Sequence, residues 1–313
     1  MLRAVCMDRR LSVVMTVVRD SAHGHPGHDN HDRFFKVGWP TLRDGLAWAE
    51  VDAFFVVLPA AERAAFRARL DQEATVPAHR SAFQLVTEES LCGPWLRGAE
   101  QSRVQMFCKL AVAARHVRTM AYLVLDDDCV LLRPFGARDQ FADGGRRLKF
   151  THDPVFHEGW WRGSAWALGM DWDGEAEPAL RSLRRKERII QVTPALLDAA
   201  AVRRLLASLG GPMARRLLLH APSQRRWTEY TLYWLSLHQE GALEKTHSGS
   251  RLRLSNGTTS VWFATPDLVD KLRDMRAAGR VRGYFGVIQS NVREHTADFV
   301  QRAWARSAAP AVS

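Results

Sequence analysis

Short apolar segments alternate with helical patterns through the first half of the chain, and this alternation restricts the fold more than any other feature. Strands are expected where β-branched and aromatic residues cluster, at residues 12–18, 53–58, 83–86 and 122–125. Helices are expected between them, one starting after Pro59 and one over 101–117. The pattern predicts an α/β fold with a mixed, mostly parallel sheet flanked by helices.

The second half of the chain has a less regular pattern. Helices are expected over residues 194–209, 228–237, 266–277 and 292–305, and strands over 188–192 and 260–263. The 313 residues show neither an internal repeat nor a clear linker. We therefore expect a single elaborated domain over residues 1–313.

The charge balance and the cysteines restrict the partners and the compartment. Lys and Arg number 44 against 34 Asp and Glu, and a net charge of +10 favours anionic partners. No nucleic-acid-binding motif appears, so no nucleic-acid partner is expected. The four cysteines form no CxxC pair, and the apolar run at 11–18 is too short to span a bilayer. We expect a cytoplasmic protein without a transmembrane segment, and peripheral contact with a membrane stays open.

Three consecutive aspartates, Asp126, Asp127 and Asp128, follow the apolar run 122–125. Ligands of such sheets bind beyond the carboxyl ends of the strands, where Asp20 is also expected. Three half-buried carboxylates repel one another unless a cation neutralises them, and Mg²⁺ and Mn²⁺ take carboxylate oxygens. Since Asp126 and Asp128 point the same way in an extended segment, the pattern predicts a divalent metal held by these two.

The helix containing Gln105 and Lys109, followed by YLVLDDDCV at 122–130, resembles the helix-then-DxD segment of GT-A glycosyltransferases. The resemblance covers about residues 10–150 and implies a GT-A-like, Rossmann-like fold. It implies a metal-dependent glycosyltransferase in which Mn²⁺ or Mg²⁺ on the DxD motif clamps the diphosphate of a nucleotide-sugar donor. Residues 1–135 would then form the nucleotide-binding half and residues 136–313 the acceptor-binding half.

The resemblance also assigns roles to individual residues. Asp126 and Asp128 become metal ligands. The residues that bind the nucleotide-sugar become Asp20, Gln105, Lys109 and Asp127. For Gln105 and Lys109, which lie four residues apart on one helix face, an ordinary place on the helix surface is the alternative.

A second segment, RWTEYTLYW at 226–234, resembles the Ser/Thr-Glu-Tyr signature of some DxD glycosyltransferases. This makes Glu229 the candidate catalytic residue, as general base in an inverting reaction or as an acceptor-orienting group in a retaining one. An exposed first-turn glutamate behind the N-cap Thr228 is the alternative. A third metal ligand is often a histidine in GT-A enzymes, and His247 is the candidate. The acceptor, whether glycan, lipid or protein, is not defined.

Two further segments have more than one interpretation. The His- and Gly-rich segment 23–32 is expected to be a mobile loop near the donor pocket rather than a metal site. Trp160 and Trp161 either stack on an acceptor sugar or lie buried in the core.

Two rival functions remain open. The run LDDDCV at 125–130 approximates the motif of haloacid-dehalogenase-type phosphatases, in which Asp126 would be the nucleophile and Asp128 the general acid beside Mg²⁺. That motif ordinarily sits on the first strand, whereas here three strand-like runs precede it. The other rival is a non-catalytic protein of the same fold that binds a nucleotide-sugar or glycan.

Overall fold

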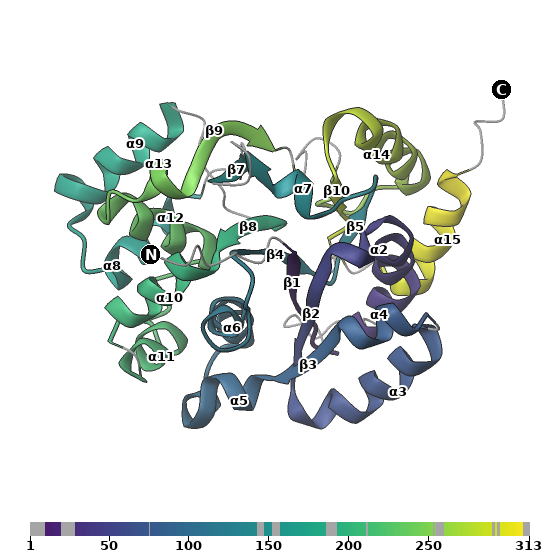
Figure 1. Ribbon diagram of the computed structural model, residues 1–313, viewed down its shortest axis with the longest axis horizontal. Coiled ribbons are helices and arrows are strands. Elements are labelled where there is room, and N and C mark those ends of the chain that lie inside the picture. Colours follow the sequence, from purple (N-terminus) through teal and green to yellow (C-terminus); the bar gives the residue numbers. More distant parts are fainter. Residues whose placement is uncertain are drawn as a thin grey trace, which may run out of the picture.

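A computed structural model describes residues 10–19, 29–74, 76–142, 147–151, 157–185, 193–210, 212–252, 254, 260–289, 292 and 295–308. Its central five-stranded sheet has the strand order β3-β2-β1-β4-β8 (Figure 1). The strands are β1 (Leu11–Thr16), β2 (Val51–Leu58), β3 (Phe83–Thr87), β4 (Ala121–Asp126) and β8 (Ala195–Asp198). The first four are parallel and β8 is antiparallel, which confirms the predicted mixed, mostly parallel sheet and its first four strands.

Helices cover both faces of the sheet, as expected for strands that are mostly apolar on both faces. Val14, Phe55 and Val124 belong to a core cluster on one face that includes residues of α6 (Gln101–Arg115), α10 (Ala199–Ser208) and α12 (Glu229–Gln239). Val13, Phe54 and Leu123 belong to the cluster on the other face, which includes Phe66 of α3 (Arg63–Glu73). Figure 1 shows α6, α10 and α12 on one side of the sheet and α2, α3 and α4 on the other.

Two smaller sheets and the remaining helices surround this core. One sheet pairs β5 (Cys129–Leu131) with β10 (Phe285–Val287), and the other has β6 (Phe141–Ala142), β7 (Arg147–Thr151) and β9 (His247–Leu252). The predicted C-terminal helices are confirmed as α14 (Leu268–Arg282) and α15 (Ala297–Ser307). The other helices are α1 (Asn30–Arg33), η1 (Phe34–Gly38), α2 (Trp39–Gly45), η2 (Trp48–Glu50), η3 (Ala60–Glu62), α4 (Pro77–Ala82), α5 (Glu88–Cys92), η4 (Gly93–Leu96), α7 (Ala137–Gln140), α8 (Glu158–Ala167), η5 (Trp172–Ala176), α9 (Glu177–Arg185), α11 (Pro212–Leu219) and α13 (Leu243–Thr246).

Two predictions for the second half are wrong. The predicted helix 194–209 begins only at Ala199, after the Asp198 side chain accepts a hydrogen bond from the Ala201 amide. The apolar residues before it extend the sheet as β8, because Leu196 and Leu197 are fully buried against β4. The predicted strand 260–263 is reduced to an isolated bridge between Val261 and Ile288. The predicted strand 188–192 lies outside the described residues.

The sheet has a topological switch point between β1 and β4. The chain passes from β1 to β2 on one side, whereas β4 lies on the other side of β1. Thr16 at the end of β1 pairs with both Val57 of β2 and Asp126 of β4, so these carboxyl ends are level. Crevices at such points are where open α/β sheets bind ligands. Asp126 therefore lies at the position that the topology marks for a ligand.

In the described part of the chain, no helix combines the length and apolar character that crossing a membrane requires.

Candidate active site

The three aspartates lie where β4 ends and the chain turns into β5. Asp126 is the last residue of β4, and Asp127 and Asp128 form the turn. The side chain of Asp126 is 35% exposed, whereas Asp127 and Asp128 are buried. The predicted extended geometry is wrong, because the turn sets the directions of the second and third side chains instead of strand alternation.

Lys109 links this turn to Glu229. Its Nζ forms ion pairs with Asp126 Oδ1 and, at 2.8 Å, with Glu229 Oε1. Burial by itself lowers the pKa of Lys109, but the charges of Asp126 and Glu229 raise it well above its ordinary value. Lys109 is thus a buried, protonated group, and the alternative of a surface residue is wrong for it. Gln105, one turn earlier on α6, is partly exposed.

Arg33 is a second buried cation beside the aspartates, and the sequence analysis did not identify it. Its Nη1 donates to the His295 carbonyl at 2.6 Å and its Nη2 to the Ile288 carbonyl. Burial lowers the pKa of Arg33, while the nearby charges of Asp128 and Asp127 raise it. The Ile288 amide donates to the Asp128 carbonyl at 2.9 Å. Arg33 therefore ties the segment after β10 to the aspartate turn.

These two cations change the electrostatic argument for a metal. Burial and the charges of Asp128 and Asp126 raise the pKa of Asp127 well above its ordinary value, and Arg33 and Lys109 oppose that shift. The protein itself thus supplies compensating charge. The predicted neutralising cation is thus present within the chain itself, as Lys109 and Arg33, and a divalent metal stays a prediction.

The donor set still fits a hard divalent cation. Mg²⁺ is typically held by one or two carboxylates and takes its remaining ligands from phosphate and water. Asp126 and Asp128 provide such oxygens at the switch point. Among the described residues, no group of three or more His, Cys, Asp or Glu side chains is placed to hold a metal.

Glu229 is the first residue of α12 and is 2% exposed. Thr228 caps the helix, with its hydroxyl accepting a hydrogen bond from the Thr231 amide at 3.2 Å. The alternative of an exposed first-turn glutamate is wrong, because the carboxylate points to Lys109. This position makes Glu229 a partner of Lys109 and gives no direct support to a role as general base.

His247 lies away from the aspartates. Its Nε2 is 2.8 Å from the Tyr233 hydroxyl, which accepts a hydrogen bond from the Asp198 amide at 3.0 Å. Asp198 pairs with Ala121, the first residue of β4. Asp126 lies five residues further along β4, about 17 Å away. This geometry does not bring His247 to the proposed metal.

The remaining predicted residues have mixed outcomes. Asp20 and residues 21–28 of the His-rich segment lie outside the described residues. The end of that segment is not a loop, because Asp29 caps α1 and the buried His31 contacts Glu62 at 2.7 Å. Trp161 is fully buried in the core, whereas Trp160 is partly exposed.

Gly163 of α8 packs closely against the backbone of Arg226, three residues before Glu229. A Cβ added to Gly163 of α8 would lie 1.7 Å from the Arg226 carbonyl oxygen. On the same helix, a Cβ on Gly159 would meet nothing within 4 Å. The close approach at Gly163 therefore depends on glycine, and the one at Gly159 does not.

We expect Gly163→Ala to lower the free energy of unfolding by about 2–4 kcal/mol, because either α8 or the Arg226 backbone must move. Gly159→Ala is the matched control and should be neutral or stabilising by up to about 1 kcal/mol. Urea unfolding of both variants measures this difference. Equal stabilities would contradict the close packing of α8 on the segment before Glu229.

Glu88 is a further buried carboxyl at the same edge of the sheet. It directly follows β3 and accepts a hydrogen bond from Gln101 Nε2 at 2.8 Å. Burial raises its pKa from 4.5 to about 7, and the hydrogen bond from Gln101 opposes that shift. Glu88 therefore changes charge near neutral pH in the folded protein.

Glu88→Gln should stabilise the protein by roughly 2–3 kcal/mol at about pH 8 and by less than about 0.5 kcal/mol at about pH 4.5. Because the folded pKa is raised, the unfolded chain releases the proton first as the pH rises. The wild type thus loses stability between pH 4.5 and about pH 7. Urea unfolding at both pH values checks this, and a gain independent of pH would refute it.

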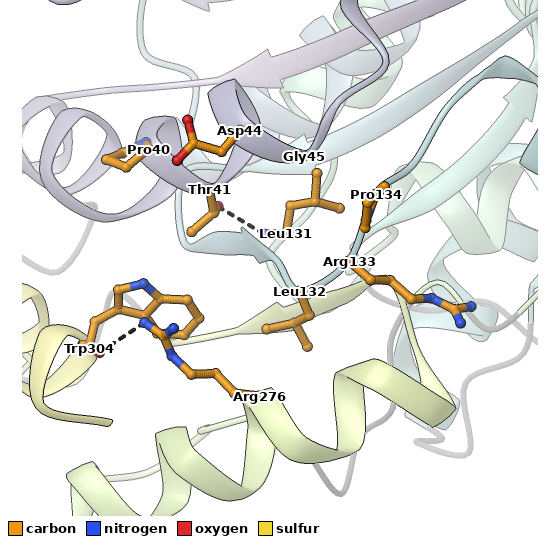
Figure 2. A pocket seen from close by; sticks show the side chains of 10 residues that line it. All are labelled: Pro40, Thr41, Asp44, Gly45, Leu131, Leu132, Arg133, Pro134, Arg276 and Trp304. Carbon is orange, nitrogen blue, oxygen red and sulfur yellow. Dashed lines mark hydrogen bonds between the residues drawn. The ribbon is translucent and has the colours of Figure 1, made fainter. Parts of the chain in front are cut away.

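A separate pocket of about 330 Å³ lies between α2, the segment after β5, α14 and α15 (Figure 2). Thr41 on α2 accepts a hydrogen bond from the Leu131 amide at 2.9 Å. Arg276 lies over the Trp304 ring, 3.7 Å from its centroid. From the β5 segment, the pocket is lined by residues 131–134. Leu131 is at the end of β5 that lies away from Asp128, so the pocket is distinct from the aspartate turn.

A family model described as a family of unknown function, DUF6492, matches residues 8–305. The chain belongs to the DUF6492 family. This DUF6492 protein matches no curated protein. The fold of the DUF6492 chain is similar to several solved structures. One is the galactosyltransferase LgtC in complex with donor and acceptor sugar analogues, with 12% identity, a TM-score of 0.48 and 97% of each chain covered.

Two further solved structures resemble this DUF6492 protein. Mouse xyloside xylosyltransferase 1 has 11% identity and a TM-score of 0.44, with 90% of this chain and 99% of that chain covered. The bifunctional glycosyltransferase WbbM has 9% identity and a TM-score of 0.45, with 99% of this chain and 53% of that chain covered. These values are too low to assign an activity, so the function must be argued from the site itself.

Proposed function

We propose that this protein is a glycosyltransferase that moves a sugar from a nucleotide-diphosphate donor to an acceptor. The observation that carries the proposal is the aspartate turn at the switch point of a mostly parallel sheet. The turn sits between two buried cations, Lys109 and Arg33. A crevice of this kind favours a nucleotide, and carboxylates beside it favour a diphosphate bound through a divalent metal.

In this proposal Asp126 and Asp128 hold Mn²⁺ or Mg²⁺. When bound there, the metal would supply positive charge to stabilise the leaving nucleoside diphosphate. Lys109 orients Asp126 through one ion pair and is itself held by Glu229 through a second. Arg33 limits the repulsion between Asp127 and Asp128. Gln105, with its partly exposed side chain, and Asp20 are the proposed further contacts of the donor.

Hydrolysis of nucleotide-sugars in the absence of an acceptor tests this proposal. The protein is incubated with a panel of nucleotide-sugars with Mn²⁺, with Mg²⁺ and with EDTA, and the released nucleoside diphosphate is measured. We expect release from one donor class, only with metal. Release of inorganic phosphate from p-nitrophenyl phosphate instead would favour the phosphatase.

A non-catalytic binding protein is the second candidate, and the burial of Glu229 favours it. Glu229 faces Lys109 and not solvent, so the described residues near the turn include no exposed candidate base on α12. Metal-dependent binding of a nucleotide-sugar, without hydrolysis and without transfer to any acceptor, would identify this second function.

A further inference from the structure

The pocket between α2, α14 and α15 is lined by an arginine whose charge is not matched by a carboxylate of the described residues (Figure 2). Arg276 is partly buried on α14, and its guanidinium carbon lies 3.7 Å from the centroid of the Trp304 ring. Its Nη2 donates a hydrogen bond to the Trp304 carbonyl at 2.9 Å, and its Nε is buried without a hydrogen-bond partner. Burial lowers the pKa of Arg276, and no charge among the described residues opposes that shift.

This state of Arg276 favours an anion in the pocket. A partly buried cation is unfavourable when no opposite charge replaces the water that it loses. Nη1 of Arg276 forms no hydrogen bond with the described residues, so it remains available as a donor. Guanidinium groups bind carboxylates through charge-assisted N–H···O bonds. A carboxylate in the pocket would therefore supply both the missing charge and an acceptor.

Two other polar side chains of the pocket already have partners within the protein. The Thr41 hydroxyl donates to the Gly38 carbonyl at 2.8 Å and accepts from the Leu131 amide at 2.9 Å. The Asp44 carboxylate forms an ion pair with its neighbour Arg43, at 2.7 Å from Nε to Oδ1. The negative charge of Asp44 is thus met outside the pocket and does not neutralise Arg276.

The second arginine that lines the pocket is directed elsewhere. In Figure 2 the side chain of Arg276 runs toward Trp304, whereas that of Arg133 runs in the opposite direction. The Arg133 guanidinium lies over the Tyr284 ring instead, 3.7 Å from its centroid. One cation, Arg276, therefore faces the pocket. A single carboxylate matches this charge better than a phosphate monoester, which carries nearly two negative charges at neutral pH.

The remaining walls of the pocket are apolar and held by the fold. They include Pro40, Leu131, Leu132 and Pro134. Leu131 is buried, and Leu132 and Trp304 pack against a core cluster that contains residues of α14 and α15. A volume of about 330 Å³ is at the small end of the range for ligand pockets. The pocket thus fits a small apolar body next to a charged group.

We infer that this pocket binds a small organic acid, with its carboxylate on Arg276 and its apolar body against the leucine and proline side chains. The inference does not depend on the proposed glycosyltransferase function, because the pocket is distinct from the aspartate turn.

Saturation-transfer NMR titrations test this inference. The probes are benzoate, cyclohexanecarboxylate and hexanoate, the neutral amide of each acid, and inorganic phosphate, in a buffer without carboxylates. We expect at least one acid to bind the wild type saturably, with its amide and phosphate about 10-fold weaker or more. Arg276→Met should weaken binding of that acid about 10- to 100-fold. Arg273→Met is the matched control one turn earlier on α14, where Arg273 pairs with Asp270, and should retain the affinity.

The same titration on Asp128→Asn separates this site from the proposed donor site, and the acid should bind this variant as it binds the wild type. Loss of binding there would place the acid at the aspartate turn and overturn the inference. It would also be overturned if no acid binds, if an amide or inorganic phosphate binds as tightly as the acid, or if both arginine variants lose affinity alike. The comparison of each acid with its amide uses the wild type alone and so does not depend on the folding of any variant.

Discussion

Lys109→Met is expected to lower the free energy of unfolding by about 3–5 kcal/mol, because it leaves the buried Glu229 carboxylate without its cation. Lys109 Nζ contacts Asp126 and Glu229, and Glu229 is 2% exposed. Removing one partner of a buried pair costs far more than the pair itself contributes, since the remaining charge is poorly solvated. Urea unfolding at neutral pH measures the change.

Two comparisons separate this effect from a simple loss of packing. Lys36 also contacts two carboxylates, Asp32 and Asp298 at 2.7 Å each, but its side chain is 27% exposed. Lys36→Met should therefore cost about 1 kcal/mol or less. Adding Glu229→Gln to Lys109→Met should recover at least about 1 kcal/mol, because it removes the stranded charge. Equal costs for the two lysines, or no recovery, would contradict the buried ion-pair network.

Asp128→Asn is expected to lower metal-dependent donor hydrolysis by roughly 100- to 1000-fold, which is typical for loss of one charge-stabilising group in an active site. Its stability should change by less than about 1 kcal/mol, because the substitution removes both the repulsion between Asp128 and the buried Asp127 and the attraction between Asp128 and the buried Arg33. The activity assay and urea unfolding are run on the same preparation.

Asp44→Asn serves as the control for the charge change. Asp44 is an exposed aspartate that pairs with its neighbour Arg43, on the helix that borders the separate pocket. Its hydrolysis rate should match that of the wild type. A similar loss in both variants, or unfolding of Asp128→Asn, would show that the aspartate turn has a structural role only.

The parallel part of the fold could be predicted because local pattern and tertiary environment agree there. Strands β1, β2, β3 and β4 are mostly apolar and mostly buried, as expected for strands with both faces covered. Helix α6 has the expected start at Gln101. The aspartates could be placed at the end of β4 because they directly follow its apolar residues in the sequence. The rule that ligands bind beyond the carboxyl ends of strands then made them candidate site residues.

Other features depend on contacts that no local pattern encodes. Residues Ala195–Asp198 continue an apolar helical pattern, but pairing with β4 makes them a strand. Lys109 and Glu229 are 120 residues apart in sequence, so their ion pair appears only in the folded chain. Arg33 binds carbonyl groups of Ile288 and His295, which are more than 250 residues away. In the sequence Arg33 follows Asp32 in a polar segment, so no local pattern marks it as a buried residue.

His247 was predicted as a metal ligand from its residue type, and its position in the fold does not support that role. Histidine is a common metal ligand, and the choice among several histidines rested on the order of motifs along the chain. The hydrogen bond to Tyr233 instead places His247 near the start of β4. A residue of this kind can be assigned only once the strand register is known.

Calorimetric titration of nucleoside diphosphates, with and without Mn²⁺, tests whether the aspartate turn binds a diphosphate through a metal. We predict that the wild type binds one nucleotide class only when metal is present, and that Asp128→Asn loses this binding while remaining folded. Binding that is equally strong without metal, or unchanged in Asp128→Asn, would contradict a metal-diphosphate site at the aspartate turn. Absence of binding by every nucleotide with metal present would refute the donor site altogether.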